Sequence, residues 1–401
     1  MVKIAVLGYG TVGSGIVEVI KTNQKLIDER AGEQIDIKYI LDLRDFPNDP
    51  YESLVVHDAD VILQDSEVRV IAEAMGGIEP AFTFTKRALS SGKSVCTSNK
   101  ELVEKHGAEL CELAKANNCS YLFEASVGGG IPILRPLVTC LTADHIDAVT
   151  GILNGTTNYI LTRMDEDGSD YEQVLKEAQN MGYAERNPEA DVEGHDAGRK
   201  IAILASLITG KNADFDNIYT EGITGVTPED FVYARAMKRV IRLLAMYREK
   251  NGSYFAYVAP AMIGRDNPLY GVRDVFNSIL VHGNMLGNAM FYGAGAGKLP
   301  TASAVASDVV DCVKSLGTTL PGGWSSEKLP LTDHKSRSKR FFVRVEEKDA
   351  ASFTEVFGEC EVYTGLVEGE RGFLTAEMDE NEFEEKAAKV SGYISRIRVE
   401  D

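Results

Sequence analysis

The sequence predicts an α/β protein with a doubly wound parallel sheet, an α+β second domain and a small C-terminal βαββαβ domain. Three observations predict it. A short β-branched run, residues 3–7, leads directly into a glycine-rich turn and a helical pattern. Apolar strands and helical segments then alternate to about residue 126, as in doubly wound sheets. Residues 341–401 have the order strand, helix, strand, strand, helix, strand, typical of a split βαβ domain.

The glycine-rich turn after the first strand has the pattern GxGxxG. Its first glycine permits a tight turn, its second lets a pyrophosphate approach the backbone, and its third allows helix to pack on strand. The helix that follows offers amide groups and a partial positive charge to phosphates. We therefore expect a Rossmann-type dinucleotide site here. Its residues are Gly8, Tyr9, Gly10, Thr11, Val12 and Gly13.

The second strand, residues 35–43, ends at two charged residues that bear on cofactor choice. An acid at this place, such as Asp42, holds the ribose hydroxyls of NAD, whereas an arginine, such as Arg44, pairs with the 2′-phosphate of NADP. Because both are present, the sequence leaves NAD and NADP open.

The alternation continues along the first third of the chain. We expect strands at 55–63, 68–77, 93–99 and 119–126, and helices at 80–91 and 100–117. Ligands on such sheets bind beyond the carboxyl ends of the strands, where Lys100 and residues 124–130 fall. Three successive glycines, 128–130, indicate backbone that approaches a ligand or an ion.

The middle of the chain is expected to be mixed in structure. Asn154-Gly155 is typical of a turn, with Thr156 and Thr157 capping the next helix. Apolar spacing predicts a long helix over about 227–248 and a strand over 253–263. A second glycine-rich segment, 292–297, precedes a helix near Thr301, and we interpret it as a loop closing over the first site.

The stretch from Gly182 to Lys200 has the densest polar chemistry. A helix is expected from near Glu193 to before Gly210, and Asp196 and Lys200, four residues apart, share one face of it. Asp191 lies just before this helix and Glu185 in the preceding loop. Taken alone, the pattern is more typical of a solvated helix start with a surface ion pair.

Composition excludes several classes of protein. The net charge of -19 argues against nucleic-acid binding, which needs basic surfaces. No apolar run approaches the roughly 20 residues of a membrane span. Six cysteines without metal-ligand spacing are interpreted as free thiols in a reducing cytoplasm. We expect a soluble cytoplasmic protein without a targeting segment.

Six segments together resemble homoserine dehydrogenase. They are GYGTVG at 8–13, SNK at 98–100, EASVGGGIPI at 124–133, GILNGTTNYIL at 151–161, GYAE and DVEGHDAGRK within 182–200, and GAGAGKLPTASAV at 293–305. The resemblance implies reversible hydride transfer between L-homoserine and L-aspartate 4-semialdehyde with NAD(P), a step toward threonine, methionine and isoleucine.

The resemblance also implies roles for individual residues. Lys200 is the proton shuttle, Lys100 stabilises the alkoxide or aldehyde oxygen, and Asp196 orients the reacting groups. The implied substrate-binding residues are Glu185, Asp191, Asp196, Thr156 and Gly155. Further cofactor contacts fall on Lys100, Gly182, Gly295 and Gly297. A monovalent cation, usually sodium, is implied at Glu124, Val127, Gly129 and Ile131.

The expected domains follow the same match. Residues 1–130 form the NAD(P)-binding domain, with a return segment at 293–316; residues 131–316 form the substrate and dimerisation domain; residues 317–340 are a linker; and residues 341–401 are an ACT-like domain. A homodimer or larger homo-oligomer is implied through the central sheet. The C-terminal domain is short and lacks the Asp-x-Pro-Gly turn, which leaves threonine as a candidate effector only.

Two other functions stay open. An aspartate dehydrogenase-like enzyme could share the two-domain organisation, but it should lack the residues from Glu185 to Lys200. A non-catalytic nucleotide or effector sensor has no need of a base such as Lys200.

Overall fold

The computed structural model describes residues 1–400 and divides into two compact units. Unit 1 comprises Met1–His145, Ala202–Asp216 and Phe291–Leu329. Unit 2 comprises Ile146–Ile201, Asn217–Met290 and Pro330 onward.

Unit 1 is built on a six-stranded sheet in which every strand pair is parallel. The strands are β1 (Val2–Leu7), β2 (Ile35–Leu41), β3 (Val55–Val56), β4 (Val68–Glu73), β5 (Ser94–Thr97) and β6 (Tyr121–Leu122), in the order β3-β2-β1-β4-β5-β6. This is the strand order of a dinucleotide-binding Rossmann sheet. The predicted Rossmann-type parallel sheet is therefore confirmed.

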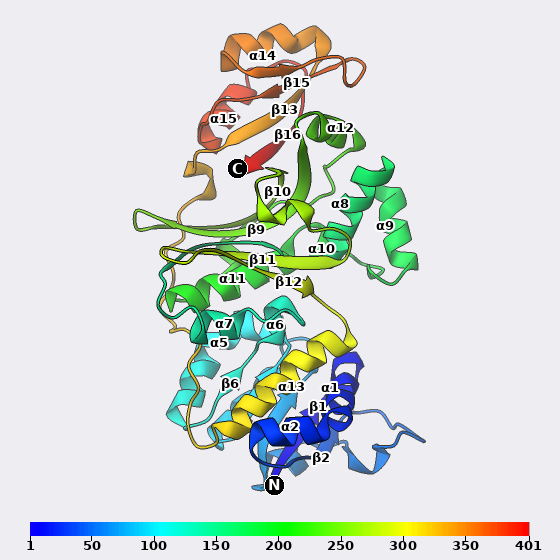
Figure 1. The fold of residues 1–401 in the computed structure, drawn as a ribbon, viewed down its shortest axis with the longest axis vertical. Helices are drawn as coiled ribbons and strands as arrows, with labels where there is room; N and C mark the ends of the chain where they lie inside the picture. Colours follow the sequence, from blue (N-terminus) through cyan, green and yellow to red (C-terminus); the bar gives the residue numbers. More distant parts are fainter. Residues whose placement is uncertain (401) are drawn as a thin grey trace. The chain divides into compact units, whose positions relative to one another are not determined.

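Helices cover this sheet because its strands are apolar on both faces. They are α1 (Thr11–Thr22), α2 (Gln24–Ala31), α3 (Ala59–Leu63), α4 (Ala81–Ser90), α5 (Lys100–Ala116), α6 (Ala125–Gly128), α7 (Leu134–Thr139) and α13 (Lys298–Lys314), with 3-10 turns at Glu52–Leu54 and Phe215–Asn217. In Figure 1, α13 (yellow) runs beside α1 (blue). Gly15 of α1 permits this packing, since a Cβ there would lie 3.0 Å from that of Ala302.

Two of the stretches expected to be strands in unit 1 are partly helical. Residues 55–63 form only the two-residue strand β3 and then α3, because the Asp58 side chain caps the helix by accepting the Asp60 N–H. The strand expected over 119–126 ends at Leu122, and Ala125 begins α6. Apolar composition alone did not distinguish these short helices from strands.

Unit 2 contains a ten-stranded mixed sheet. Its strands are β7 (Ile146–Ile152), β8 (Tyr219–Thr220), β9 (Arg239–Lys250), β10 (Ser253–Gly264), β11 (Phe276–Gly283), β12 (Gly287–Ala294), β13 (Arg340–Glu346), β14 (Glu361–Tyr363), β15 (Glu370–Leu374) and β16 (Tyr393–Glu400). Its order is β12-β11-β7-β9-β10-β16-β13-β15-β14, and β8 also pairs with β10.

The helices associated with unit 2 surround that sheet. They are α8 (Gly155–Asp167), α9 (Tyr171–Asn180), α10 (Glu189–Val192), α11 (His195–Thr209), α12 (Pro228–Ala236), α14 (Ala350–Phe357) and α15 (Glu380–Ala387), with 3-10 turns at Pro268–Gly271, His334–Ser336 and Glu347–Asp349. Helix α11 passes from unit 2 into unit 1 after Ile201.

The long helix predicted over 227–248 is wrong. Helix α12 ends at Ala236, Lys238 adopts a left-handed φ of 57°, and β9 begins at Arg239. Strand β9 is buried from Val240 to Tyr247, so it shows no alternation of apolar and polar residues. An apolar run that is buried on both faces does not reveal its period, and helical spacing fits it by accident.

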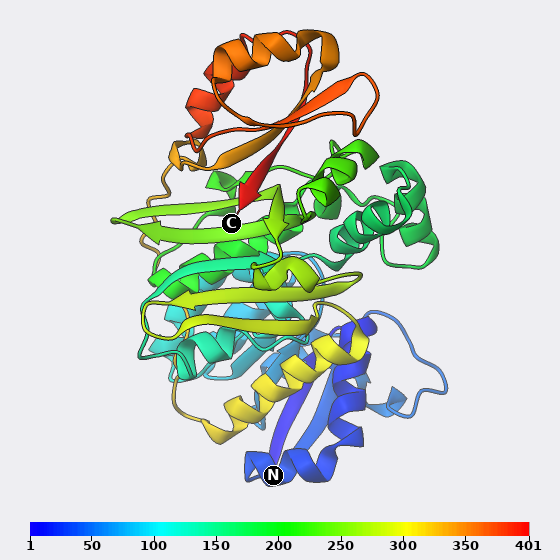
Figure 2. The same ribbon diagram turned by 45° about the horizontal axis from the view of Figure 1, so that its top comes forward.

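The C-terminal elements have the expected βαββαβ order, but they do not stand apart from the central sheet. Strand β16 pairs antiparallel with β13 and parallel with β10, with Ala261 opposite Arg398. Figure 2 shows β16 (red) running from the C-terminal elements to the central strands. A single strand therefore joins the two parts of unit 2 by backbone hydrogen bonds.

Within residues 1–400 no helix is both long enough and apolar enough to cross a bilayer. All six cysteines are free, as predicted. The sulfur atoms of Cys96 and Cys312, both buried in unit 1, are 3.5 Å apart.

Candidate active site

Lys200 lies at the centre of a buried polar cluster in unit 2. Its Nζ donates to Oδ2 of Asp196 at 2.7 Å and to the carbonyl oxygen of Leu153 at 2.7 Å. Lys200 and Asp196 are only 8% and 5% exposed, so the ion pair is not the surface pair that the stretch alone indicated. A buried pair with both partners hydrogen-bonded holds its geometry far better than a surface pair.

Asn154 organises this cluster, and the sequence had indicated only a turn there. Its Nδ2 donates to Oδ1 of Asp191 at 2.7 Å and to Oδ2 of Asp196 at 3.0 Å. Its Oδ1 accepts the N–H of Thr157, which makes Asn154 the N-cap of α8. The two predicted acids are therefore held together by one amide group. The only sequence signal was an asparagine before a helix, which is too common to identify it.

The other predicted substrate residues of unit 2 have structural contacts of their own. Thr156 and Thr157 do not cap α8; Thr156 donates to the carbonyl of Tyr183 at 2.7 Å, and the cap is Asn154 because its side chain precedes the first turn. Gly155 begins α8, where a Cβ would lie 2.7 Å from the carbonyl oxygen of Val275. Glu185 is exposed, and its carbonyl accepts from the Gln179 side chain.

The glycine-rich turn of unit 1 has the geometry that its motif requires. Gly8 adopts a φ of 90°, and a Cβ on Gly13 would lie 1.8 Å from the Gly8 oxygen. A Cβ on Gly10, by contrast, would meet no atom within 4 Å. Gly8 and Gly13 are thus required by the fold, whereas Gly10 leaves open backbone at the start of α1, where a pyrophosphate would bind.

Asp42 and Arg44 face each other beside this turn. Oδ1 of Asp42 lies 2.9 Å from Nε of Arg44, and its Oδ2 accepts the Tyr9 N–H at 2.9 Å. Hydrogen bonding to Arg44 lowers the pKa of Asp42 despite its burial. The Arg44 side chain is 63% exposed, so its guanidinium reaches solvent while Asp42 holds the turn.

The carboxyl ends of β4 and β5 carry a buried acid that sequence reasoning missed. Glu73 accepts the Met75 N–H at 2.7 Å and also the hydroxyl of Thr97. Burial raises the pKa of Glu73 to about 7, although these hydrogen bonds act in the opposite direction. Lys100 begins α5 at the same edge of the sheet.

The carboxylate of Glu124 caps the N-terminus of α7 in unit 1. Its carboxylate accepts the N–H groups of Ile133 at 2.6 Å, Leu134 at 2.9 Å and Arg135 at 2.6 Å. Its own N–H donates to Asp308 at 2.9 Å. Burial raises the pKa of Asp308 to about 7 against the opposing charge of Arg135.

No three His, Cys, Asp or Glu side chains gather as a metal site among residues 1–400, although a cation held mainly by carbonyls needs no such group.

The glycines at 128–130 lie close to the second glycine-rich segment and to the start of α13. A Cβ on Gly129 would lie 2.2 Å from the Gly295 oxygen, and one on Gly130 would lie 2.6 Å from Cβ of Pro300. The close approach of Gly129 to the Gly295 backbone and of Gly130 to Pro300 therefore requires glycine at both positions. The second segment is not simply a loop, because Ala294 ends β12 and Gly297, with a φ of 123°, precedes α13.

The parallel sheet with its glycine-rich turn has the architecture of a dinucleotide-binding enzyme, and the buried lysine is a group that can exchange a proton. Residues 8–124 match the family model "Homoserine dehydrogenase, NAD binding domain", and residues 132–310 match "Homoserine dehydrogenase". A homoserine dehydrogenase from Bacillus subtilis is 38% identical over 370 residues, which cover 89% of this chain and 85% of that one.

Solved structures give the same result. A homoserine dehydrogenase from Thiobacillus denitrificans superposes with a TM-score of 0.89 at 32% identity, over 100% of this chain and 98% of that one. A hyperthermophilic archaeal homoserine dehydrogenase, solved with NADPH, has a TM-score of 0.66 at 26% identity, over 80% of this chain and 99% of that one. The chain belongs to the homoserine dehydrogenase family of NAD(P)-binding oxidoreductases.

Proposed function

We propose that Lys200 is the proton shuttle of homoserine oxidation. The observation that carries this role is the placement of its buried Nζ between Asp196 and the Leu153 carbonyl. An ammonium group has three N–H donors, and these two contacts leave the third for a substrate hydroxyl. The charged form donates a proton to the aldehyde oxygen during reduction, and the neutral amine accepts the hydroxyl proton during oxidation.

Bound NAD(P) would supply the hydride acceptor and donor for the carbinol carbon of the substrate. We assign Lys100 to the stabilisation of the developing charge on the substrate oxygen. Its support is its place at the start of α5, beyond the carboxyl end of β5. Asp196 orients Lys200 throughout.

The acids around Asn154 are assigned to the substrate. An ammonium group such as that of L-homoserine is recognised by carboxylates, and Asp191 and Asp196 already share one amide donor. The proposed substrate site is completed by Glu185, Thr156 and Gly155. The family match supports all three, and the position of Gly155 and Thr156 directly after Asn154 supports those two further. A test of substrate class is the change in absorbance at 340 nm with homoserine against malate and aspartate.

The proposed nucleotide site is the turn Gly8, Tyr9, Gly10, Thr11, Val12 and Gly13, with Asp42, Arg44 and Lys100 beside it and Gly182, Gly295 and Gly297 as further contacts. The exposed guanidinium of Arg44 supports NADP, because Asp42 is occupied by Arg44 and by the Tyr9 N–H. The archaeal neighbour with NADPH is consistent with this preference. Binding of NAD remains the second alternative.

Sodium is proposed at Glu124 and the carbonyls of Val127, Gly129 and Ile131. Oxygen donors suit a hard cation. Glu124 uses three of its roughly four lone-pair sites for N–H groups, which leaves one for an ion. Thermal unfolding in sodium chloride and in choline chloride tests this site without an activity measurement; equal midpoints would contradict it.

A homodimer or larger assembly is proposed through the sheet of unit 2. Strand β12 is an edge of that sheet, and the adjacent Met285 and Leu286 are 83% and 47% exposed. Exposed apolar side chains at a sheet edge are typical of association surfaces. Light scattering on the purified chain tests the assembly.

The proposed domains are the NAD(P)-binding domain, the substrate and dimerisation domain and a C-terminal domain after a linker. They span, in that order, residues 1–130 with 293–316, residues 131–316 and residues 341–401, and the linker is 317–340. The last domain is ACT-like in the order of its elements. Its effector is proposed to be threonine, which a binding isotherm tests. We further propose a cytoplasmic location, which fractionation of cells tests.

A further inference from the structure

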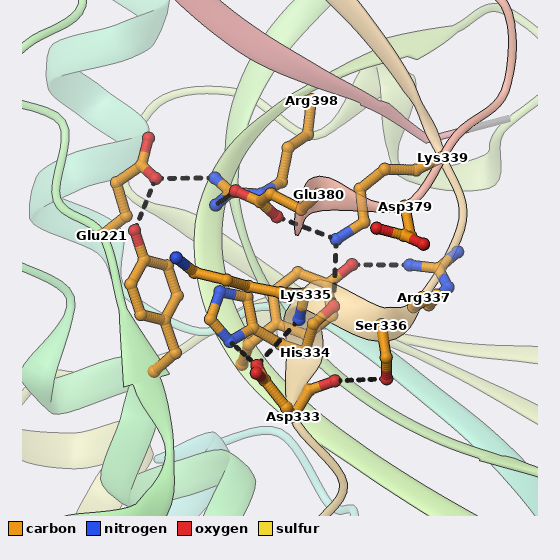
Figure 3. A network of polar contacts seen from close by, with 12 residues as sticks. Glu221, Asp333, His334, Lys335, Ser336, Arg337, Lys339, Asp379, Glu380 and Arg398 are labelled. Atoms are coloured by element: carbon orange, nitrogen blue, oxygen red, sulfur yellow. Dashed lines mark hydrogen bonds and ion pairs between the residues drawn. The ribbon is translucent and has the colours of Figure 1, made fainter. Parts of the chain in front are cut away.

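Glu221 is clamped by two arginines of the C-terminal strand. Arg396 donates to both carboxylate oxygens, at 3.0 and 3.1 Å, and Arg398 donates to Oε2 at 2.7 Å. The Tyr219 hydroxyl donates to the same Oε2 at 2.9 Å. Figure 3 shows the contact between Glu221 and Arg398 as a dashed line. The carboxylate is therefore held from β16, whereas its backbone belongs to the central part of unit 2.

The clamp is part of a larger buried network. Glu380, at the start of α15, accepts from Arg396 at 2.9 Å and from Lys339 at 3.2 Å, and it also pairs with Arg398. The side chains of Lys339 and Glu380 are each 1% exposed. Because Glu380 also holds both arginines, they keep their positions independently of Glu221 and can therefore position its carboxylate.

The segment that follows Glu221 supports the turn between α10 and α11. The Ile223 N–H donates to the Val192 carbonyl at 2.8 Å, and the Thr224 hydroxyl donates to Glu193 at 3.1 Å. A Cβ on Gly222 would lie 2.3 Å from the Val192 oxygen. Residues 221–224 therefore fit closely against Val192 and Glu193, with no space for displacement in that direction.

This turn separates the two acids of the proposed substrate site. Asp191 lies in α10, immediately before Val192, and Asp196 lies in the first turn of α11. Both must reach the single amide of Asn154. A shift of the turn by a few tenths of an ångström would lengthen one of these two hydrogen bonds, since their donor is the same group.

We propose that Glu221 is a positioning residue for the substrate site, through which Arg396 and Arg398 of the C-terminal strand fix the separation of Asp191 and Asp196. The inference rests on the proposed roles of those two acids. A cavity of about 760 Å³ borders Glu221, Thr224 and Arg396, so the segment has space to move away from the turn once the clamp is cut.

The test is steady-state kinetics of the full-length chain with Glu221→Gln, which keeps the shape of the side chain and removes its charge. Homoserine KM should rise by about threefold to tenfold, while cofactor KM and kcat each stay within about twofold. Gly222→Ala disturbs the same turn without touching the arginines, and it should raise homoserine KM in the same direction. Glu221→Asp, which retains the charge, should recover part of the loss.

Glu370→Gln is the matched control. Glu370 makes a similar bidentate pair with Arg344, with both bonds at 2.8 Å, and it has no contact with residues 221–224. It should leave homoserine KM unchanged. Arg396→Gln combined with Glu221→Gln should raise KM no further than the more affected single variant, because both changes cut one pair.

An unchanged homoserine KM in folded Glu221→Gln would overturn the proposal. So would an equal rise in Glu370→Gln, or a parallel rise in cofactor KM, since either would indicate a general loss of structure. If Glu221→Gln does not fold, Gly222→Ala and Glu221→Asp decide the question by the same KM criterion. Failure of the site assignment itself is separate: it would appear as normal homoserine KM in Asp191→Asn and Asp196→Asn.

Discussion

The Nζ of Lys200 is held 2.7 Å from the carboxylate of Asp196, one helical turn before it, in a buried part of α11. The pair is fixed further by the Leu153 carbonyl and by Asn154, which binds the same oxygen of Asp196. Lys200 therefore has a defined orientation before any substrate arrives, as a proton shuttle requires.

Lys200→Ala should reduce kcat by about 10² or more, because it removes the amine that exchanges the substrate proton. Cofactor KM should stay within about twofold. Lys176→Ala, an exposed lysine of α9, is the control and should be neutral. Stopped-flow and steady-state rates at 340 nm measure the effect, and a kcat near that of the wild type would refute the assignment.

Asn154→Ser should raise homoserine KM by about tenfold, because serine still caps α8 but cannot join Asp191 to Asp196. The loss of stability should be small, since both residues are good caps. Asp170→Ser is the matched control, because it replaces the N-cap residue of a different helix, α9, by the same serine. Comparable KM values for the Asn154 and Asp170 variants would show that the amide bridge has no role in substrate binding.

Arg44→Ala should raise KM for NADP by about tenfold or more, since a charge-assisted bond to the 2′-phosphate is lost. KM for NAD should change little or fall, because Asp42 is released from its pair. Both constants are measured with homoserine at saturation. If NADP and NAD are affected alike, Arg44 does not select between them.

Glu73→Gln should change the pH dependence of stability. The folded-state pKa is raised from 4.5 to about 7, so the folded chain binds more protons than the unfolded chain between these values. Stability is therefore lost as pH rises through this window, and the variant avoids the loss. From pH 5 to pH 8 the variant should gain on the order of 1–3 kcal/mol relative to the wild type.

Urea unfolding at both pH values measures this difference. Glu112→Gln, at an exposed position in α5, is the control. A constant difference between Glu73→Gln and the wild type across this range would contradict the raised pKa.

The sequence by itself determined the features whose physical cause is local. The turn from Gly8 to Gly13 was readable because its three glycines act within six residues of one another, between one strand and one helix. The pairing of Asp196 with Lys200 followed from helical spacing alone. The order of the C-terminal elements was likewise predictable, since each element is short and bounded by polar residues.

Tertiary structure decided what depends on residues far apart in the chain. Asn154 meets Asp191 and Asp196 across 37 and 42 residues, and Arg398 meets Glu221 across 177, so no spacing pattern could reveal these contacts. The buried run Val240–Tyr247 of β9 resembled a helix because burial on both faces removes the alternation that identifies a strand. The packing of Gly129 against Gly295 could not be predicted, because the two residues are more than 160 positions apart. Local geometry is encoded by neighbouring residues, whereas burial and the choice of partner are set only when the chain has folded.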